Sequence, residues 1–528
     1  MTLWIALHLP LLSLESFAAT LPHAAGERPL ALLDAQHIVA VNAPARALGV
    51  QPGFKRATAL ALAPQLTFGL ADPVRDAQAL MAVAHAALAF TPTVVIEPPG
   101  DAGSTTAATT APGDTPHTVL LEVQASLRYF GGLAALQQRL TSALAPLGHH
   151  LHIVSASTPL GAALLARVHP KLACADLAAT TRALAHAPVW LLGPGRAQRE
   201  ALQGMGLHTL GDLQRVPRDG LARRFGPAVL DALDRALGRR PDPRVSLALP
   251  PAFDSRLELF ACADTTEQLM HGAAVLLARL VAWLAAQHAF VRRFTLVMAH
   301  ERRSRHDALG SGITSLEVAL AEPSRDSAHL QVLLRERFAQ LQLPAPTLDL
   351  RLHADDIARR APPNTELFPT PAAEHEGLTR LIERLQARLG RAQVQRLVSV
   401  PDHRPERATA CRAADAQMAR ARSPGGPAGA PEAAGAARPM RPVWLLQRPE
   451  PLHERAVPGG ERGPWADGQP LRLLSGPERI ESGWWDFDVV ARDYYIAQLP
   501  DGALVWIFRE RVPTSGVKLN WFLQGRFG

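Results

Sequence analysis

Carboxylate and histidine side chains are the groups from which a catalytic or metal site could be built, and this chain has few at useful spacing. Asp486 and Asp488 form an Asp-x-Asp pair in the run WWDFDVVARD. Such a pair is superficially like a divalent-cation site, because it offers two hard anionic ligands close together. Arg479 and Arg492 lie nearby in the sequence, so we interpret the pair as strand-edge carboxylates bound to one of these arginines.

The histidines and cysteines give no stronger signal. His149, His150 and His152 lie near the start of a predicted strand, but no cysteine or carboxylate stands at ligand spacing, which favours solvated side chains. No GxxxxGK[ST] loop is present, so ATPase activity is not expected. The three cysteines are too far apart for a CxxC zinc site or a disulfide scaffold, and suit a reducing compartment: Cys174, Cys262 and Cys411.

The composition predicts several folded domains in a soluble protein. Hydrophobic residues make up 47% and charged residues 20% of the 528 residues, and the net charge of +7 permits a polyanion partner without requiring one. The apolar N-terminus resembles a signal peptide, but no Lys or Arg precedes Arg28, and Pro10 and Glu15 interrupt it. We therefore predict a buried strand turning into a helix there, no membrane span, and a cytoplasmic location.

Two low-complexity stretches divide the chain. Residues 99–117 form an insert within a folded region, and residues 412–442, rich in Ala, Pro and Gly, form a linker. The block after the linker holds six of the nine tryptophans and two of the three tyrosines. Its runs LRLLSG, DYYIAQL and ALVWIFRER predict a small β-rich module whose aromatic side chains form its core or an interaction face.

Residues 190–243 have the layout of a helix-hairpin-helix. The Gly193-Pro194-Gly195 turn separates two helical patterns, and a second glycine turn follows at 204–206. In this motif the tight turn and the next helix start present backbone N–H groups to a DNA phosphate. An ordinary helical hairpin with glycine caps is the alternative, but the following GLHTLGDLQRVP run and the basic pair Arg223 and Arg224 favour DNA binding.

Residues 255–357 alternate between strand and helix patterns. Strands are predicted at 256–262, 292–300, 313–321 and 345–354, and helices near 266–287 and 327–341. Five arginines gather around one hairpin and form either a solvated end or a phosphate-tracking surface: Arg292, Arg293, Arg302, Arg303 and Arg305.

Taken together, these segments resemble Y-family (translesion) DNA polymerases, and within them the ImuB-type proteins of damage-induced mutagenesis. The pattern Asn42-x-x-Ala45-Arg46-x-x-Gly49-Val50-x-x-Gly53 is similar to the family's finger motif, SASTPLGAALLARVHP (155–170) to a palm segment, and LLSGPERIESGWWDFDVVARDYY to the ImuB-type C-terminus. The resemblance implies an α+β multidomain fold with right-hand architecture. Its parts would be palm and fingers (1–185, fingers about 19–65), helix-hairpin-helix thumb (186–243), little finger (250–360), clamp-binding peptide and helix (361–411), linker (412–442) and C-terminal interaction module (443–528).

The resemblance also shows which residues are missing. The family holds two Mg²⁺ ions with an Asp-x-Asp and an Asp-Glu pair, as two-metal nucleotidyl transfer requires. Aligned on Glu15, the first pair falls at Ala6 and His8, and aligned on the LLEV strand, the second falls at His117 and Thr118. Of the residues with which the family binds the incoming nucleotide, Arg46 remains as a vestige, whereas Ala43 stands in place of the family's Tyr. We expect no catalytic residue, bound metal or cofactor.

An active translesion polymerase with relocated metal ligands is the alternative. Glu122 on the LLEV strand would then act with Asp101 or Asp114, both in the low-complexity insert. A polymerase of this kind would still need three carboxylates within metal distance.

Partner contacts follow from the same resemblance. Asn364, Leu367 and Phe368 match the sliding-clamp peptide Gln-x-x-Leu-Phe, with an amide one methylene shorter; a hydrophobic staple before the next helix is the alternative. The C-terminal region would bind a RecA-like accessory protein and an error-prone DnaE-type polymerase. The residues expected to contact the backbone of primed or damaged DNA are Gly193, Gly195, Arg196, Arg302, Arg303 and Arg305.

Overall fold

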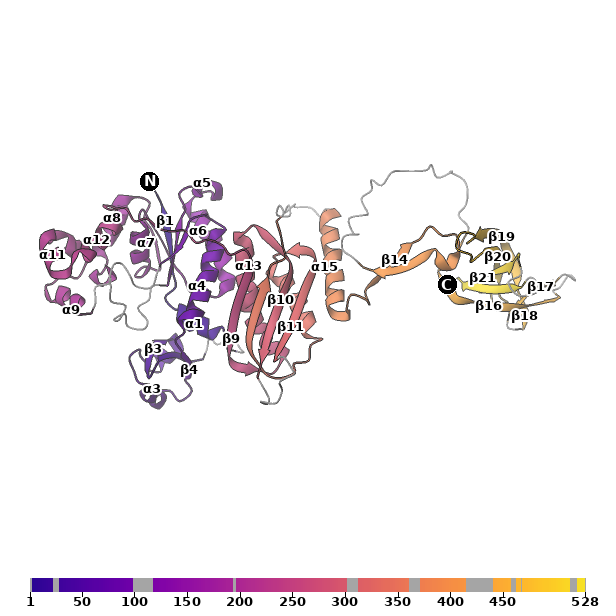
Figure 1. The fold of residues 1–528 in the computed structure, drawn as a ribbon, viewed down its shortest axis with the longest axis horizontal. Helices are drawn as coiled ribbons and strands as arrows, with labels where there is room; N and C mark the ends of the chain where they lie inside the picture. Colours follow the sequence, from indigo (N-terminus) through magenta and orange to yellow (C-terminus); the bar gives the residue numbers. More distant parts are fainter. Residues whose placement is uncertain are drawn as a thin grey trace. The chain divides into compact units, whose positions relative to one another are not determined.

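The computed structural model describes residues 2–21, 28–97, 117–192, 196–301, 312–359, 371–414, 440–456, 462–466, 468–512 and 520–527. For 196–199 and 371–376 it describes the backbone only. The chain forms two compact units, Met1–Arg388 and Leu389–Gly528. The first holds palm, fingers, thumb and little finger, and the second holds the C-terminal module (Figure 1).

The palm is a five-stranded sheet in the order β5-β6-β1-β7-β8, with the N-terminal strand in the centre. Alternate residues of β1 face opposite sides, so Ala6 packs with α7 while Ile5 and Leu7 pack with α4 and α6. The chain turns directly from β1 into α1, as predicted for the N-terminus. The palm elements are β1 (Trp4–His8), α1 (Leu12–Ala18), α4 (Pro73–Leu88), β5 (Val94–Ile96), β6 (Thr118–Glu122), α5 (Leu127–Phe130), α6 (Leu133–Leu144), η1 (Ala145–Leu147), β7 (His152–Ala156), α7 (Pro159–Ala166), β8 (Lys171–Ala173) and α8 (Leu177–His186).

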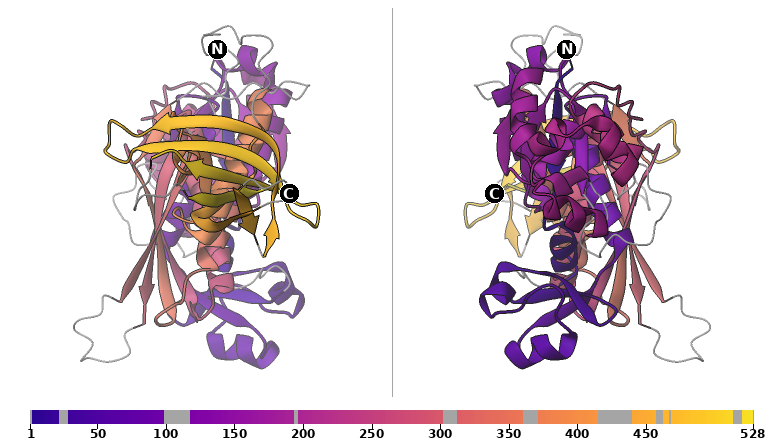
Figure 2. Two further views of the ribbon diagram at one scale, coloured as in Figure 1. Left: turned by 90° about the vertical axis from the view of Figure 1, so that its right-hand side faces the viewer. Right: turned by 90° about the vertical axis from the view of Figure 1, so that its left-hand side faces the viewer.

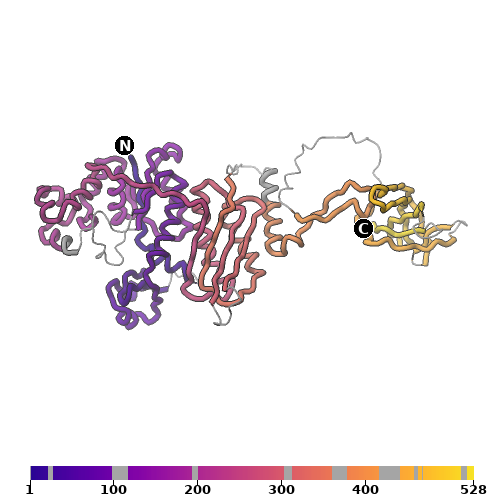
Figure 3. Tube along the Cα trace, viewed as in Figure 1, coloured from indigo at the N-terminus to yellow at the C-terminus, as the bar shows by residue number. Residues whose placement is uncertain are grey.

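The fingers form a small lobe that the chain enters after α1 and leaves before α4, as Figures 2 and 3 show. Its sheet has the order β3-β2-β4, with β2 and β4 parallel. Ala45, Val50 and Ala59 lie in its buried core. The elements are β2 (Leu30–Asp34), β3 (His37–Val41), α2 (Ala43–Ala47), α3 (Arg56–Leu62) and β4 (Thr67–Leu70).

The thumb is entirely helical. Its leucines continue the palm core on the α7 side, so thumb and palm share one hydrophobic cluster. Thr209 and Asp212 form a capping box at the start of α10, and Gly206 before it has a φ of 77°, which favours glycine. The elements are η2 (Val189–Leu192), α9 (Arg196–Gly204), α10 (Leu210–Arg215), α11 (Arg218–Phe225) and α12 (Pro227–Ala236).

The little finger has the strand-helix-strand-strand-helix-strand order that the sequence pattern predicts. Its sheet order is β11-β10-β12-β9, with β13 pairing with β10. Helix α13 starts at a capping box of Thr265 and Gln268 and packs its leucines and Trp283 on the sheet. The elements are β9 (Phe253–Ala263), α13 (Thr266–Ala286), β10 (Ala289–His300), β11 (Ile313–Ser324), α14 (Ser327–Phe338), β12 (Thr347–Ala354) and β13 (Ile357–Arg359).

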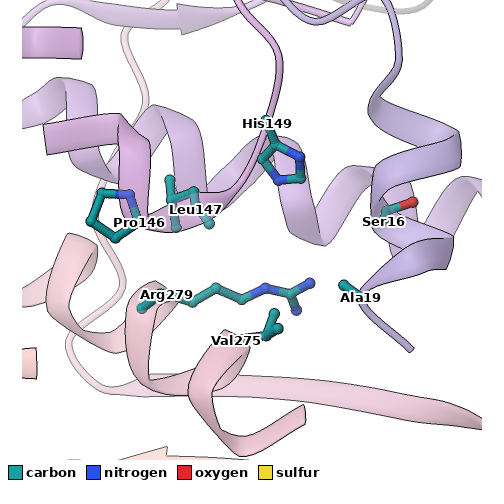
Figure 4. A pocket seen from close by; sticks show the side chains of 9 residues that line it. Ser16, Ala19, Pro146, Leu147, His149, Val275 and Arg279 are labelled. Carbon is teal, nitrogen blue, oxygen red and sulfur yellow. The ribbon is translucent and has the colours of Figure 1, made fainter. Parts of the chain in front are cut away.

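Helix α13 also joins the little finger to the palm. It packs against α4, and its Ala282 belongs to the palm core. In the described residues α13 is the one helix long and apolar enough to cross a membrane, but most of it is buried in this double contact. A cavity of about 30 Å³ lies at the junction, and the Arg279 side chain extends along it toward Ser16 of α1 and Ala19, the residue after α1 (Figure 4).

Helix α15 (Pro371–Leu389) is attached to the little finger by its polar side. The Glu383 carboxylate accepts hydrogen bonds from the backbone N–H groups of Ala321 (2.6 Å) and Glu322 (3.1 Å) and is bonded to His329 Nε2 (2.7 Å). A leucine stripe with helical spacing predicts this helix, and most of it faces outward, with Leu378 50% and Leu381 53% exposed; its members are Leu378, Leu381, Ile382, Leu385 and Leu389. Periodicity therefore identifies the helix but not the side on which it packs.

The C-terminal unit contains a seven-stranded sheet in the order β18-β17-β16-β22-β21-β20-β19 and the hairpin β14–β15. The hairpin differs from the predicted division, because residues 389–414 precede the linker yet fold with the module: Arg404 is buried against Asp486 and Asp488. The elements are β14 (Gln395–Ser399), η3 (Pro405–Arg407), β15 (Thr409–Ala413), β16 (Trp444–Ala456), β17 (Arg462–Ala466), β18 (Gln469–Pro470), β19 (Arg472–Ser482), β20 (Val490–Gln498), β21 (Leu504–Glu510) and β22 (Trp521–Arg526).

Candidate active-site position in the palm

The palm register brings the residues aligned with the family's carboxylates to the end of two neighbouring strands. His8 of β1 lies opposite Thr118 of β6, and Ala6 lies opposite Leu120. His117 directly precedes β6, and its carbonyl accepts a hydrogen bond from Leu9 N at 2.9 Å. The four positions therefore lie close together at one end of the neighbouring strands β1 and β6, although they are distant in sequence. This group of Ala6, His8, His117 and Thr118 is called the palm corner below.

His8 is the central side chain of this corner. Its Nδ1 is hydrogen-bonded to Thr118 Oγ1 at 3.1 Å, and its ring lies 5.8 Å from the ring of His152 on the other neighbouring strand. Burial, with added repulsion from His152, Arg167 and His117, lowers the pKa of His8 to about 4. His8 is thus a neutral imidazole at pH 7 and supplies no negative charge.

The carboxylate on the neighbouring helix is held by hydroxyl groups. Asp76 of α4 is buried, and it accepts hydrogen bonds from Ser13 Oγ (2.5 Å) and Ser16 Oγ (2.6 Å) of α1. Ser13 Oγ also lies 3.4 Å from His117 Nε2. Burial lowers the pKa of His117, and the Asp76 charge opposes this shift. Asp76 therefore joins α1 to α4, a structural role that the sequence analysis missed because no local pattern links these residues.

Glu122, the carboxylate of the alternative polymerase hypothesis, lies at the far end of β6. It pairs with Trp4, four residues from Thr118, which corresponds to roughly 13 Å along a strand. Its Oε1 accepts a hydrogen bond from Gln124 N at 3.1 Å. Its suggested partners Asp101 and Asp114 lie outside the described residues.

The donor set at the corner does not fit the Mg²⁺ ions that the family uses. Mg²⁺ requires hard oxygen ligands, usually carboxylates, whereas this corner offers imidazoles, one threonine hydroxyl and the methyl group of Ala6. Across the ranges that the structure describes, no group of three His, Cys, Asp or Glu residues is placed to hold a metal ion. The side chains of Ala6, His8, His117 and Thr118 include hydrogen-bonding groups, but none of the four supplies an anionic oxygen to a divalent cation.

The finger motif has a structural explanation. Asn42 caps α2: its Oδ1 accepts hydrogen bonds from Ala45 N (3.1 Å) and Leu30 N (2.9 Å). Gly49 and Gly53 have φ values of 84° and 90°, where other residues are strained. Arg46, the predicted nucleotide-binding vestige, is exposed on α2.

The predicted DNA and clamp contacts fall almost entirely outside the described residues. Gly193, Gly195, Arg302, Arg303 and Arg305 lie there, as do Asn364, Leu367 and Phe368, and for Arg196 only the backbone is described.

The little-finger strands carry exposed arginines, of which the sequence analysis singled out Arg293 but not Arg256 or Arg351. Arg351 bonds Asp254 at 2.6 Å and Arg256 bonds Asp349 at 2.6 Å. Arg293 lies within 4 Å of Glu317 and Asp356. The Arg293 contacts are exposed and longer, at 3.7–3.8 Å, so they contribute little to stability and this arginine can exchange partners.

Two predicted pairings are wrong. Asp486 and Asp488 bind Arg404 and Arg407 of the β14–β15 connection, about eighty residues away, rather than a nearby arginine. Arg479 instead bonds Asp493 at 2.9 Å, and Arg492 bonds Glu406 at 3.0 Å.

The prediction of a solvated histidine at position 149 is also wrong. His149 is largely buried, and its Nδ1 lies 3.2 Å from Glu15 Oε2. The partner comes from α1, 134 residues earlier, so no ligand-like spacing signals it.

The chain is similar in sequence to known proteins over most of its length. No family model matches the chain. The chain is 32% identical over 499 residues to Protein ImuB from two strains of Caulobacter vibrioides, covering 91% of this chain and 100% of each relative. Similar solved structures include a Dbh ternary complex (14% identity, 67% of this chain and 99% of that one, TM-score 0.37) and DinB from Sulfolobus solfataricus (15%, 67% and 99%, TM-score 0.36). The chain therefore belongs to the ImuB family of Y-family polymerase-like proteins, which have a role in the response to DNA damage.

Proposed function

We propose that this protein is a non-catalytic Y-family polymerase homologue. It binds primed or damaged DNA and the sliding clamp in the cytoplasm, and it recruits a different polymerase for damage-induced translesion synthesis. The observation that carries the proposal is the palm corner, where His8, His117 and Thr118 stand at the positions aligned with the family's metal ligands. A right-hand fold without these carboxylates keeps the shape of a DNA-binding polymerase and loses the chemistry of nucleotidyl transfer.

DNA binding in this proposal uses the thumb and little finger. Gly193, Gly195 and Arg196 would contact a phosphate through the helix-hairpin-helix turn. Arg302, Arg303 and Arg305 follow β10, and they would track the phosphates beside the little-finger sheet. Arg293, exposed on β10 and 3.7–3.8 Å from its carboxylate partners, is a further cation that would exchange these partners for DNA phosphates.

Clamp binding is assigned to Asn364, Leu367 and Phe368. Two adjacent apolar side chains would enter a hydrophobic pocket on the clamp, and the Asn364 amide would orient the peptide. The segment lies between the little finger and α15, so docking there would hold the DNA-binding unit at a primer end.

The Leu367→Ala/Phe368→Ala double variant should fail to capture the sliding clamp in a pull-down with purified proteins. Asn364→Gln restores the longer amide of the clamp-peptide pattern, so it should increase capture and provides a control of opposite sign. Gel shifts on primed DNA check that both variants still bind DNA. Wild-type capture by the double variant would contradict the assignment and leave the segment as the staple before α15.

The linker and C-terminal module complete the scaffold. Residues 415–439 separate the paired strands 395–413 from the seven-stranded sheet. In the proposed function this unit binds a RecA-like accessory protein and an error-prone DnaE-type polymerase, which supplies the missing catalytic activity.

A further inference from the structure

The loop between β19 and β20 presents large aromatic side chains to solvent. In this aromatic loop (residues 483–489), Trp484 is 75% exposed and Phe487 is 96% exposed. Trp485 and Val489 are more than half exposed as well. Soluble proteins rarely leave several large apolar side chains together on one short segment unless the segment binds something.

The loop is held from behind by a buried guanidinium group. Arg404, whose side chain is 2% exposed, donates to Asp486 Oδ2 at 2.7 Å, to the Asp488 carbonyl at 3.1 Å and to Asp402 Oδ2 at 2.7 Å. Arg407 donates to Asp486 Oδ2 at 2.8 Å and to Asp488 Oδ2 at 2.6 Å. The Arg404 guanidinium holds the pKa of Asp402 down at about 2. The aromatic side chains are thus displayed on a fixed backbone.

The backbone of the loop is strained where exposure is greatest. Phe487 has a φ of 62°, a left-handed conformation that is unfavourable for a bulky residue. Gly483 has a φ of 83°, and a Cβ there would stand 2.0 Å from the Asp488 carbonyl oxygen. The fold gains no packing from the Phe487 side chain, so folding alone would favour Asn or Gly at this position.

The charges around the loop distinguish between classes of partner. Three carboxylates (Asp402, Asp486 and Asp488) surround two guanidinium groups (Arg404 and Arg407), so this cluster carries one net negative charge. Both guanidinium groups are engaged by carboxylates. A nucleic acid requires free cations for its phosphates, whereas a protein with an apolar pocket and a basic rim complements this surface.

We propose that the aromatic loop is a protein-docking surface, in which Phe487 and Trp484 insert into an apolar pocket with a cationic rim on a partner protein. Arg404 is its positioning residue, because it bonds Asp486 and the Asp488 backbone from the buried side of the loop, and its guanidinium lies 5.6 Å from the centroid of the Trp485 ring. This inference rests on the recruiting role proposed above and names the contact that performs it. Rigid aromatic anchors suit such a contact, because they bring a large apolar area at a low cost in side-chain entropy.

The test compares variants of the full-length chain for binding to two purified proteins of the same bacterium, the DnaE-type polymerase and the RecA-like accessory protein. Phe487→Asn should lower the affinity for one of them by about 30-fold, as loss of a hot-spot side chain does. Its melting temperature should stay the same or rise, because Asn tolerates the left-handed backbone. Leu397→Ser, at another exposed apolar residue of the unit, is the matched control and should bind normally.

Each other outcome overturns the inference in a distinguishable way. If the wild type binds a partner and Phe487→Asn and Trp484→Ser bind it equally well, recruitment stands and the loop is not its contact. If the wild type binds neither protein, the recruiting function fails and the inference fails with it. If the two variants lose affinity for single-stranded DNA instead, the loop is a base-stacking surface rather than a protein-docking one.

Discussion

Acidification from pH 7 to pH 4 is expected to destabilise the Met1–Arg388 unit strongly, through two palm histidines, the buried His85 and the half-buried His8. Burial lowers the pKa of His8 to about 4 and that of His85, on α4, to about 4 as well. The unfolded chain binds these protons near pH 6.5, whereas the folded chain resists them down to pH 4. The contribution of the two histidines to the free energy of unfolding is therefore fully present above pH 6.5. It falls toward pH 4, by about 3 kcal/mol for each histidine.

Calorimetry of the full-length chain between pH 4 and pH 8 measures this loss of stability. Single variants show how much of the loss each histidine causes. His85→Leu replaces an imidazole whose Nε2 finds no hydrogen-bond partner among the described residues, so it should leave stability at pH 7 almost unchanged. His8→Gln keeps a polar partner for Thr118. Each variant should lose about 3 kcal/mol less than the wild type on acidification. Equal acid sensitivity in all three proteins would show that these imidazoles are not buried as neutral groups.

Replacing Arg279 with methionine is expected to stabilise the same unit by about 3 kcal/mol. Arg279 is 4% exposed, and burial lowers its pKa to about 10. It donates hydrogen bonds to Ser255 Oγ (3.1 Å) and to the Arg256 carbonyl (3.4 Å), which are both neutral acceptors. Burying a charge without a carboxylate destabilises the folded state, and methionine fills similar space without the charge.

The gain from Arg279→Met should be equal at pH 6 and pH 8, because both values lie far below the folded and unfolded pKa of the guanidinium group. Arg279→Lys keeps a cation in the same place and should bring no gain. Chemical denaturation at the two pH values provides the measurement. A loss of stability in Arg279→Met would show that the guanidinium group has a counter-charge in the cavity between α13 and α1.

The fold was predictable where local patterns carry the information. The little-finger strands and helices follow from alternation and from helical runs of sufficient length, and the structure places α13 at 266–286 within the predicted 266–287. The β1 strand was predictable from a charge-free apolar run. The finger motif was recognisable because Asn42, Gly49 and Gly53 each meet a local backbone requirement.

Contacts between distant residues were not predictable in the same way. Arg404 and Asp486 are 82 residues apart, on either side of a low-complexity stretch, so no spacing rule pairs them. The outward leucine stripe of α15 shows the same limit. Glu383 attaches this helix by accepting hydrogen bonds from backbone N–H groups of β11. A sequence pattern of apolar and polar side chains does not predict a contact with backbone groups. The sequence shows Ala, His and Thr at the four positions aligned with the family's carboxylates, but only the β1–β6 register shows that these positions lie close together.

Primer extension by the purified full-length protein tests the central claim most directly. A primed template, all four deoxynucleoside triphosphates and Mg²⁺ or Mn²⁺ are supplied, and a gel shift on the same DNA shows that the protein binds. The palm corner of His8, His117 and Thr118 predicts DNA binding without primer extension under either metal. Extension that Glu122→Ala abolishes would contradict the scaffold proposal and identify a polymerase with relocated metal ligands.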